Sequence, residues 1–62
     1  MPTFLVVFHD KGNCDIADVT VDSNHIVFAA ALAHQKIMMR DGVAKAQELN
    51  RDTDSLTVEQ IS

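Results

Sequence analysis

The chain is poor in the residues that support or equip many small proteins. Its 62 residues include one cysteine, one proline, two glycines and no tryptophan or tyrosine. The single thiol, Cys14, cannot close an intrachain disulfide, and small secreted domains normally carry an even set of cysteines. We therefore expect a reducing, cytoplasmic location.

The sequence also lacks the residue spacings of known metal and cofactor sites. His9, Cys14, His25 and His34 are the only soft ligands, and no two of them have the spacing of a zinc finger. On a helix, His25 and His34 would point to opposite sides, because nine residues correspond to about 180° of rotation. The two glycines lie far apart and cannot form a glycine-rich phosphate loop. We expect neither a metal nor a cofactor.

Basic residues are scarce: there are five Lys and Arg against nine Asp and Glu, a net charge of −4. This balance disfavours direct nucleic-acid binding, where neutralising contacts to phosphates dominate the affinity. No apolar run approaches the roughly 20 residues of a membrane-spanning helix, and a signal peptide is not evident. We expect neither nucleic acid nor a membrane as partner.

These absences bear on how so small a domain is stabilised. A chain of this length buries only about 60% of the surface that its unfolded form exposes. Such domains usually gain support from disulfides, a structural metal or oligomerisation. Because the first two are not indicated, we expect a homodimer.

Two strands joined by a tight turn are predicted near the N-terminus. Residues 3–9 (TFLVVFH) are β-branched and aromatic and have apolar side chains on both faces, which is typical of a central strand. Residues 10–13 have turn chemistry. Residues 14–21 alternate between apolar and polar side chains, as in an outer strand.

A long helix is predicted over residues 24–41. Asp22, Ser23 and Asn24 are good N-cap residues before an apolar run, and Gly42 stands where the helix would end. Alanines at 29, 30, 31 and 33 favour the helix intrinsically.

The remaining residues predict a short helix and a third strand. Residues 43–49 have helical spacing, with a strand as the alternative. Residues 56–61 (LTVEQI) alternate as a strand does, with a short helix begun by Ser55 as the alternative. The whole chain, residues 1–62, is thus predicted to be a single ββα(α)β domain of the α+β class, with a three-stranded antiparallel sheet packed on one main helix.

The predicted long helix has two apolar faces. One arc of small residues and isoleucines should face the sheet, and it contains Ile26, Ala29, Ala30, Ala33 and Ile37. A second arc, about 140° away, holds Phe28, Leu32 and Met39, with Gln35 nearby. Either the chain's own first strand or tail covers this second arc, or the same arc of another copy does. A two-fold contact needs only one self-complementary patch.

Four acidic residues gather in the predicted hairpin and helix entry, namely Asp10, Asp15, Asp18 and Asp22. Only Lys11 offsets their charge. They are either the solvated side of an outer strand or an acidic surface aimed at a basic groove on another protein.

Catalysis is weakly supported by the pattern. The hairpin could bring Cys14 near His9, but no third group is evident that would orient the imidazole. A chain this short also has little concave volume for a substrate. We name no catalytic residue and expect a protein that is not an enzyme.

The predicted hairpin followed by an alanine-rich helix resembles the N-terminal half of HicB-type antitoxins. The resemblance covers about half of the chain without a diagnostic motif, and many small proteins of phages and plasmids share this order of elements. We predict a small self-associating interaction module, a regulatory or inhibitory accessory protein from a phage or other mobile element that targets another protein. The alternative is a structural or assembly adaptor subunit of a larger complex.

Overall fold

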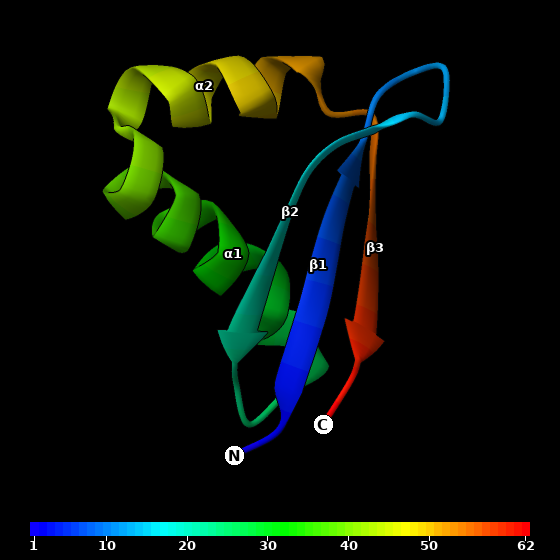
Figure 1. The fold of residues 1–62 in the computed structure, drawn as a ribbon, viewed down its shortest axis with the longest axis vertical. Helices are drawn as coiled ribbons and strands as arrows, with labels where there is room; N and C mark the ends of the chain where they lie inside the picture. The colour runs from blue at the N-terminus through cyan, green and yellow to red at the C-terminus, as the bar shows by residue number, and fades with distance from the viewer.

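The computed structural model describes all residues from 1 to 62. Its elements follow the order β1 (Thr3–His9), β2 (Asp15–Asp22), α1 (Ile26–Asp41), α2 (Val43–Asp52) and β3 (Ser55–Gln60). The strands form one antiparallel sheet in the spatial order β2-β1-β3. Both helices lie on one side of the sheet, and no element covers the other side (Figure 1). The predicted α+β fold is confirmed, as is the central position of β1.

The core lies between the inner face of the sheet and the middle of α1. Alternate residues of β1, Phe4, Val6 and Phe8, are at most 4% exposed, because their side chains point toward the helices. The other buried apolar residues come from β2 and both helices, and they are Val19, Val21, Ala29, Ala33, Ile37 and Ala46. The alanines let α1 approach the strands closely, as the predicted small-residue arc implied.

The opposite side of the sheet, which we call the open face, is set by the register of the strands. Leu5 of β1 pairs with Thr20 on β2 and with Glu59 on β3. Val7 pairs in the same way with Asp18 and Thr57. Leu5 and Val7 are only half-buried. Strand β1 thus has apolar side chains on both faces of the sheet, but helices cover only one of these faces.

The hairpin between β1 and β2 is closed by the side chain of Asp10. Its Oδ1 accepts hydrogen bonds from the backbone N–H of Gly12 at 2.9 Å and of Cys14 at 3.0 Å. Asn13 has a φ of 63°, which asparagine tolerates in turns. The β1–β2 register shifts after Phe8, leaving Ile16 as an extra residue in β2.

Helix α1 begins two residues later than predicted. Ser23 is buried, and its hydroxyl accepts a hydrogen bond from the His25 N–H and donates one to the His25 carbonyl. This local ring holds the chain in a turn, so residues 24 and 25 stay outside the helix. His25 is the N-cap and makes no side-chain capping bond.

The arc expected to face the sheet is only partly right. Ala29, Ala33 and Ile37 are buried and Ala30 is half-buried, but Ile26 is 53% exposed. Ile26 is the first residue of the helix and α1 crosses the sheet obliquely, so only the middle turns are pressed against strands (Figure 1).

Gly42 ends α1 and begins α2. Its φ of 94° and ψ of 165° fall in a region that is essentially restricted to glycine. The N–H of Gly42 donates to the Met38 carbonyl, and its own carbonyl accepts from Ala46 in the first turn of α2. The predicted end of the long helix is confirmed.

The two open questions about the tail are both resolved. The helix predicted over residues 43–49 exists and runs on to Asp52, where the Thr53 hydroxyl donates to the Leu49 carbonyl. The third strand covers Ser55–Gln60, one residue earlier than predicted, and pairs with β1. Neither α1 nor α2 has the length and apolar content that a helix needs to cross a bilayer.

Candidate functional site

The flank of α1 beside the end of β2 carries a mainly apolar stripe. It contains the four residues predicted for self-association, Phe28, Leu32, Gln35 and Met39, and we call it the outer stripe. Phe28 is 56% exposed and Met39 is 81% exposed, whereas Leu32 is half-buried because it packs against the core. The chain's own strands and tail therefore leave Phe28 and Met39 uncovered, while Leu32 is partly covered by the core.

Two shallow hollows lie where the outer stripe meets the end of β2. One, of about 470 Å³, is lined by Met1, Asp22, Ser23, Asn24, His25, Phe28, Ala31, Leu32 and Gln35. The other, of about 310 Å³, is lined by Val21, Asp22, Leu32, Gln35, Lys36 and Met39. Asp22, Leu32 and Gln35 line both hollows, so the hollows adjoin and form one groove along the helix.

The outer edge of β2 is protected next to this groove. The Lys36 ammonium donates a hydrogen bond of 2.5 Å to the Thr20 carbonyl, which points away from β1. A lysine over an edge strand blocks pairing with another strand. Contacts between copies through the β2 backbone are thus disfavoured, while the side chains of the outer stripe stay accessible.

Phe28 is held in place by its neighbour at the start of the helix. The rings of His25 and Phe28 meet edge to face, with centroids 5.9 Å apart. Such an aromatic contact favours one orientation of the phenyl ring. The exposed ring projects at one end of the outer stripe, and this contact favours its orientation.

The four predicted acidic residues differ in their contacts. Asp10 is used inside the hairpin turn, and Asp15 contacts His9. Asp22 accepts a 2.7 Å hydrogen bond from the Thr3 hydroxyl and also lines the groove. Asp18, on the open face, makes no hydrogen bond within the chain. Because Asp10 Oδ1 accepts both hydrogen bonds of the turn, Asp10 has a structural role there, and an acidic partner surface of all four residues stays a prediction.

One basic residue lies close to this acidic edge. Arg40 donates hydrogen bonds of 3.2 and 3.0 Å to the Asp41 carboxylate. The pKa of the Arg40 guanidinium is raised, first by the hydrogen bond and charge of Asp41, and to a lesser extent by the charge of Asp18. Arg40 is thus hydrogen-bonded to Asp41 and interacts with Asp18 only through its charge.

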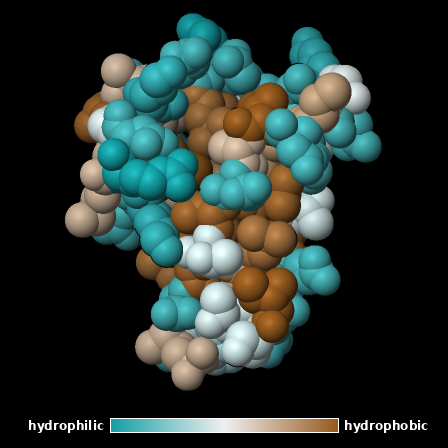
Figure 2. Space-filling model, viewed as in Figure 1, coloured by the Kyte–Doolittle hydropathy of each residue, from teal (hydrophilic) through white to brown (hydrophobic).

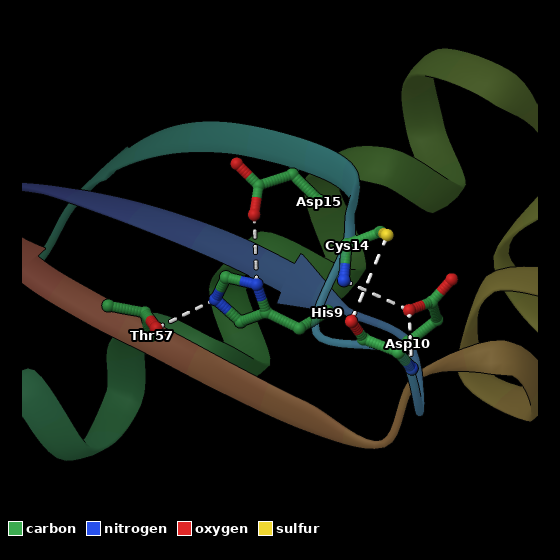
Figure 3. Close-up of polar contacts among 6 residues, drawn as sticks. His9, Asp10, Cys14, Asp15 and Thr57 are labelled. Atoms are coloured by element: carbon green, nitrogen blue, oxygen red, sulfur yellow. Dashed lines mark hydrogen bonds and ion pairs between the residues drawn. The ribbon is translucent and has the colours of Figure 1, made fainter.

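A polar cluster that the sequence analysis missed joins all three strands on the open face. His9 Nε2 lies 2.7 Å from the Thr57 hydroxyl on β3, and His9 Nδ1 lies 2.9 Å from the Asp15 carboxylate on β2 (Figure 3). The expectation that nothing would orient the His9 imidazole was wrong. The register shift at the hairpin brings Asp15 opposite His9. The sequence carries no signal for such a shift, so the cluster could not be predicted from it.

The His9 cluster has the order of a hydroxyl, an imidazole and a carboxylate, but no substrate hollow adjoins it. None of the four hollows in the surface is lined by His9 or Thr57. Cys14 is exposed, and its sulfur points toward the Gly12 carbonyl rather than the imidazole (Figure 3). We therefore describe the cluster as a cross-strand clasp. No group of three or more His, Cys, Asp or Glu side chains is arranged to hold a metal ion.

Other exposed residues extend the accessible apolar surface beyond the prediction. Met1 is 81% exposed beside Phe28 in the larger hollow, and Val27 is 75% exposed on the opposite flank of α1. Val27 was assigned to neither of the two predicted apolar arcs of the helix, so its exposure was not predicted. Figure 2 shows a second apolar band, which runs over β1 in the middle of the open face between hydrophilic residues.

Comparison with protein-family models finds no match for this chain, and comparisons with curated proteins and with solved structures find none either.

Proposed function

We propose that this protein is a self-associating protein–protein interaction module whose two copies pair through α1. The observation that carries the proposal is the exposure of Phe28 and Met39 in the outer stripe, two large apolar side chains on a helix that is apolar on nearly every side. A helix of this kind is normally buried. In the single chain, Phe28 and Met39 remain mostly in water.

The positions within the outer stripe favour an antiparallel pairing of the two α1 helices. In such a pair, residues equally far from the two-fold axis face each other. The midpoint of Phe28 and Met39 falls between Ala33 and His34, and so does the midpoint of Leu32 and Gln35. A single axis at that point sets Phe28 against Met39 of the second copy and Leu32 against Gln35.

This arrangement is also chemically suitable. A thioether beside an aromatic ring makes a favourable contact of about 0.3–1.5 kcal/mol. The helix dipoles would run antiparallel, so the partly positive start of one α1 lies beside the partly negative end of the other. The groove beside Leu32 of one copy could accommodate the Phe28 and Met39 side chains of the other copy.

Sedimentation equilibrium of Met39→Glu tests the proposal. Met39 is 81% exposed, so the substitution leaves the core intact while placing a charge in the proposed contact. The matched control is Val43→Glu, which changes an apolar residue of 56% exposure on α2, outside the outer stripe. We expect wild type and Val43→Glu to have twice the 6.8 kDa chain mass and Met39→Glu to have the chain mass.

A wild-type protein that stays monomeric at every concentration would refute the dimer. In that case the outer stripe would have to meet a different chain, as in an adaptor subunit. A regulatory or inhibitory role on a target protein, and an origin in a phage or other mobile element, remain predictions about what the dimer serves.

A further inference from the structure

The basic residues of the protein are absent from the sheet, whereas acidic residues occur in both layers. All five Lys and Arg residues lie on the helices or in the hairpin turn, and none lies on a strand. The open face instead carries the carboxylates of Asp18 and Asp22 on β2 and of Glu59 on β3. Lys36 and Arg40 approach the β2 edge from α1, but they are engaged by the Thr20 carbonyl and by Asp41.

Between these carboxylates runs the apolar band of β1. Leu5 and Val7 form its centre and are flanked by Thr20 and Thr57. Figure 2 shows this band between hydrophilic residues on its left and a mixture of hydrophilic and near-neutral residues on its right. A strand with apolar side chains on both faces normally belongs to a sheet covered on both sides. No described segment of this chain covers the open face (Figure 1).

The dimensions of the open face match those of an α-helix. Asp18 and Glu59 stand on strands separated by two strand spacings, which is about 10 Å. An α-helix with side chains is about 10–12 Å wide. The seven residues of β1 extend over about 23 Å, the length of a helix of about 15 residues. Asp18 and Asp22 on one side and Glu59 on the other would thus border a helix lying along β1.

We propose that the open face docks a basic amphipathic helix of another protein. Its apolar side chains would cover Leu5 and Val7, and its Lys and Arg side chains would reach the carboxylates on either side. The resulting complex would have helices on both faces of the sheet, a common layered architecture. Asp22 is the only residue that this surface shares with the groove beside the outer stripe, so the proposal does not depend on the dimer.

Charge argues against the competing occupants. A second copy placed face to face would bring a second set of these carboxylates close to Asp18, Asp22 and Glu59, and like charges in apposition disfavour a contact. Nucleic acid would meet the same repulsion from its phosphates. A basic helix is the occupant that complements both the apolar centre and the acidic borders.

Fluorescence anisotropy with designed peptides tests the proposal directly. The probe is a labelled 15-residue peptide with Leu at helical spacing and Lys elsewhere, about the length of β1. Two comparison peptides keep the length: one replaces every Lys by Glu, and the other scrambles the Leu and Lys positions. We expect binding of the amphipathic Lys peptide that weakens with salt, and binding at least about tenfold weaker for each comparison peptide.

Protein variants then locate the contact. Asp18→Asn with Glu59→Gln should weaken binding of the Lys peptide about tenfold, because two carboxylates are removed from the open face. The matched control, Glu48→Gln with Asp52→Asn, makes the same change of charge on α2 and should leave binding within about threefold. Val7→Thr keeps a β-branched residue, removes part of the apolar band, and should also weaken binding.

Backbone amide shifts complete the test, because they also show that each variant is folded. We expect the peptide to shift the amides of Leu5, Val7 and Thr57. The proposal is overturned if the Lys peptide does not bind, if the scrambled peptide binds equally well, if the α2 control loses as much affinity as the open-face variant, or if the shifts gather on α1.

Discussion

Replacing Phe28 with alanine should separate the two copies of the proposed dimer. Phe28 is the one aromatic side chain of the outer stripe, and 56% of its surface remains in water in the single chain. In the proposed pairing that surface is buried against Met39 of the second copy. The substitution removes the ring without adding charge or breaking a hydrogen bond.

The magnitude follows from the exposed fraction. Complete burial of a large apolar side chain contributes about 1.5–3 kcal/mol. Rather more than half of the Phe28 surface is still exposed and would be buried only in the dimer. The dimer contains two copies of Phe28, so their burial should stabilise it by about 2–3 kcal/mol. Because 1.4 kcal/mol corresponds to a factor of ten, the dissociation constant should rise about 30- to 150-fold.

Sedimentation equilibrium over a wide range of concentrations measures this change. The chain has no tryptophan or tyrosine, so interference optics should replace absorbance at 280 nm. Val27→Ala is the control, because Val27 is 75% exposed on the same turn but points to the other flank of α1. A Phe28→Ala dissociation constant within about threefold of wild type, or an equal loss in Val27→Ala, would refute the proposed interface.

Three further predictions concern stability, each measured by urea unfolding at one fixed protein concentration. Gly42→Ala should lower the free energy of unfolding by about 1–3 kcal/mol, because its backbone region is essentially restricted to glycine; Gly12→Ala, where an added Cβ meets only ordinary contacts, should change it little. Thr57→Val should cost about 0.5–1.5 kcal/mol by removing the hydroxyl next to His9, and an unchanged free energy would show that the clasp contributes nothing. Val6→Ala should cost about 2–3 kcal/mol because Val6 is fully buried, and a smaller loss would mean that the core closes over the gap.

The fold could be predicted from sequence because local and long-range signals agree. The two-sided apolar pattern of residues 3–9 predicted a central strand, and β1 is central. Gly42 predicted the end of the long helix, because few other residues adopt such a backbone. The start of α1 was predicted wrongly, since Ser23 could cap a helix or close a turn and only the tertiary structure decides between them.

The candidate surfaces were predictable in part. Helical periodicity alone places Phe28, Leu32 and Met39 together, because their relation depends only on the rotation per residue. The His9 clasp depends on strand register, which a single bulge changes by one residue and which no periodicity reveals. The open face likewise required knowledge of where α1 and α2 pack. Its acidic borders combine Asp18 with Glu59, residues far apart in the chain that the sequence analysis did not connect.

A double-mutant cycle between Phe28 and Met39 can establish which residues meet across the dimer. The two residues are eleven positions apart on one helix, about 16 Å, so they do not touch within a copy. Substitutions that far apart normally add in their effects on the stability of a single chain. If Phe28 faces Met39 of the second copy, Phe28→Ala and Met39→Ala remove the same contact, and together they should weaken dimerisation by clearly less than the product of their separate effects. Effects that simply multiply would place the two residues in separate contacts and rule out the antiparallel axis between Ala33 and His34, even if the dimer itself exists.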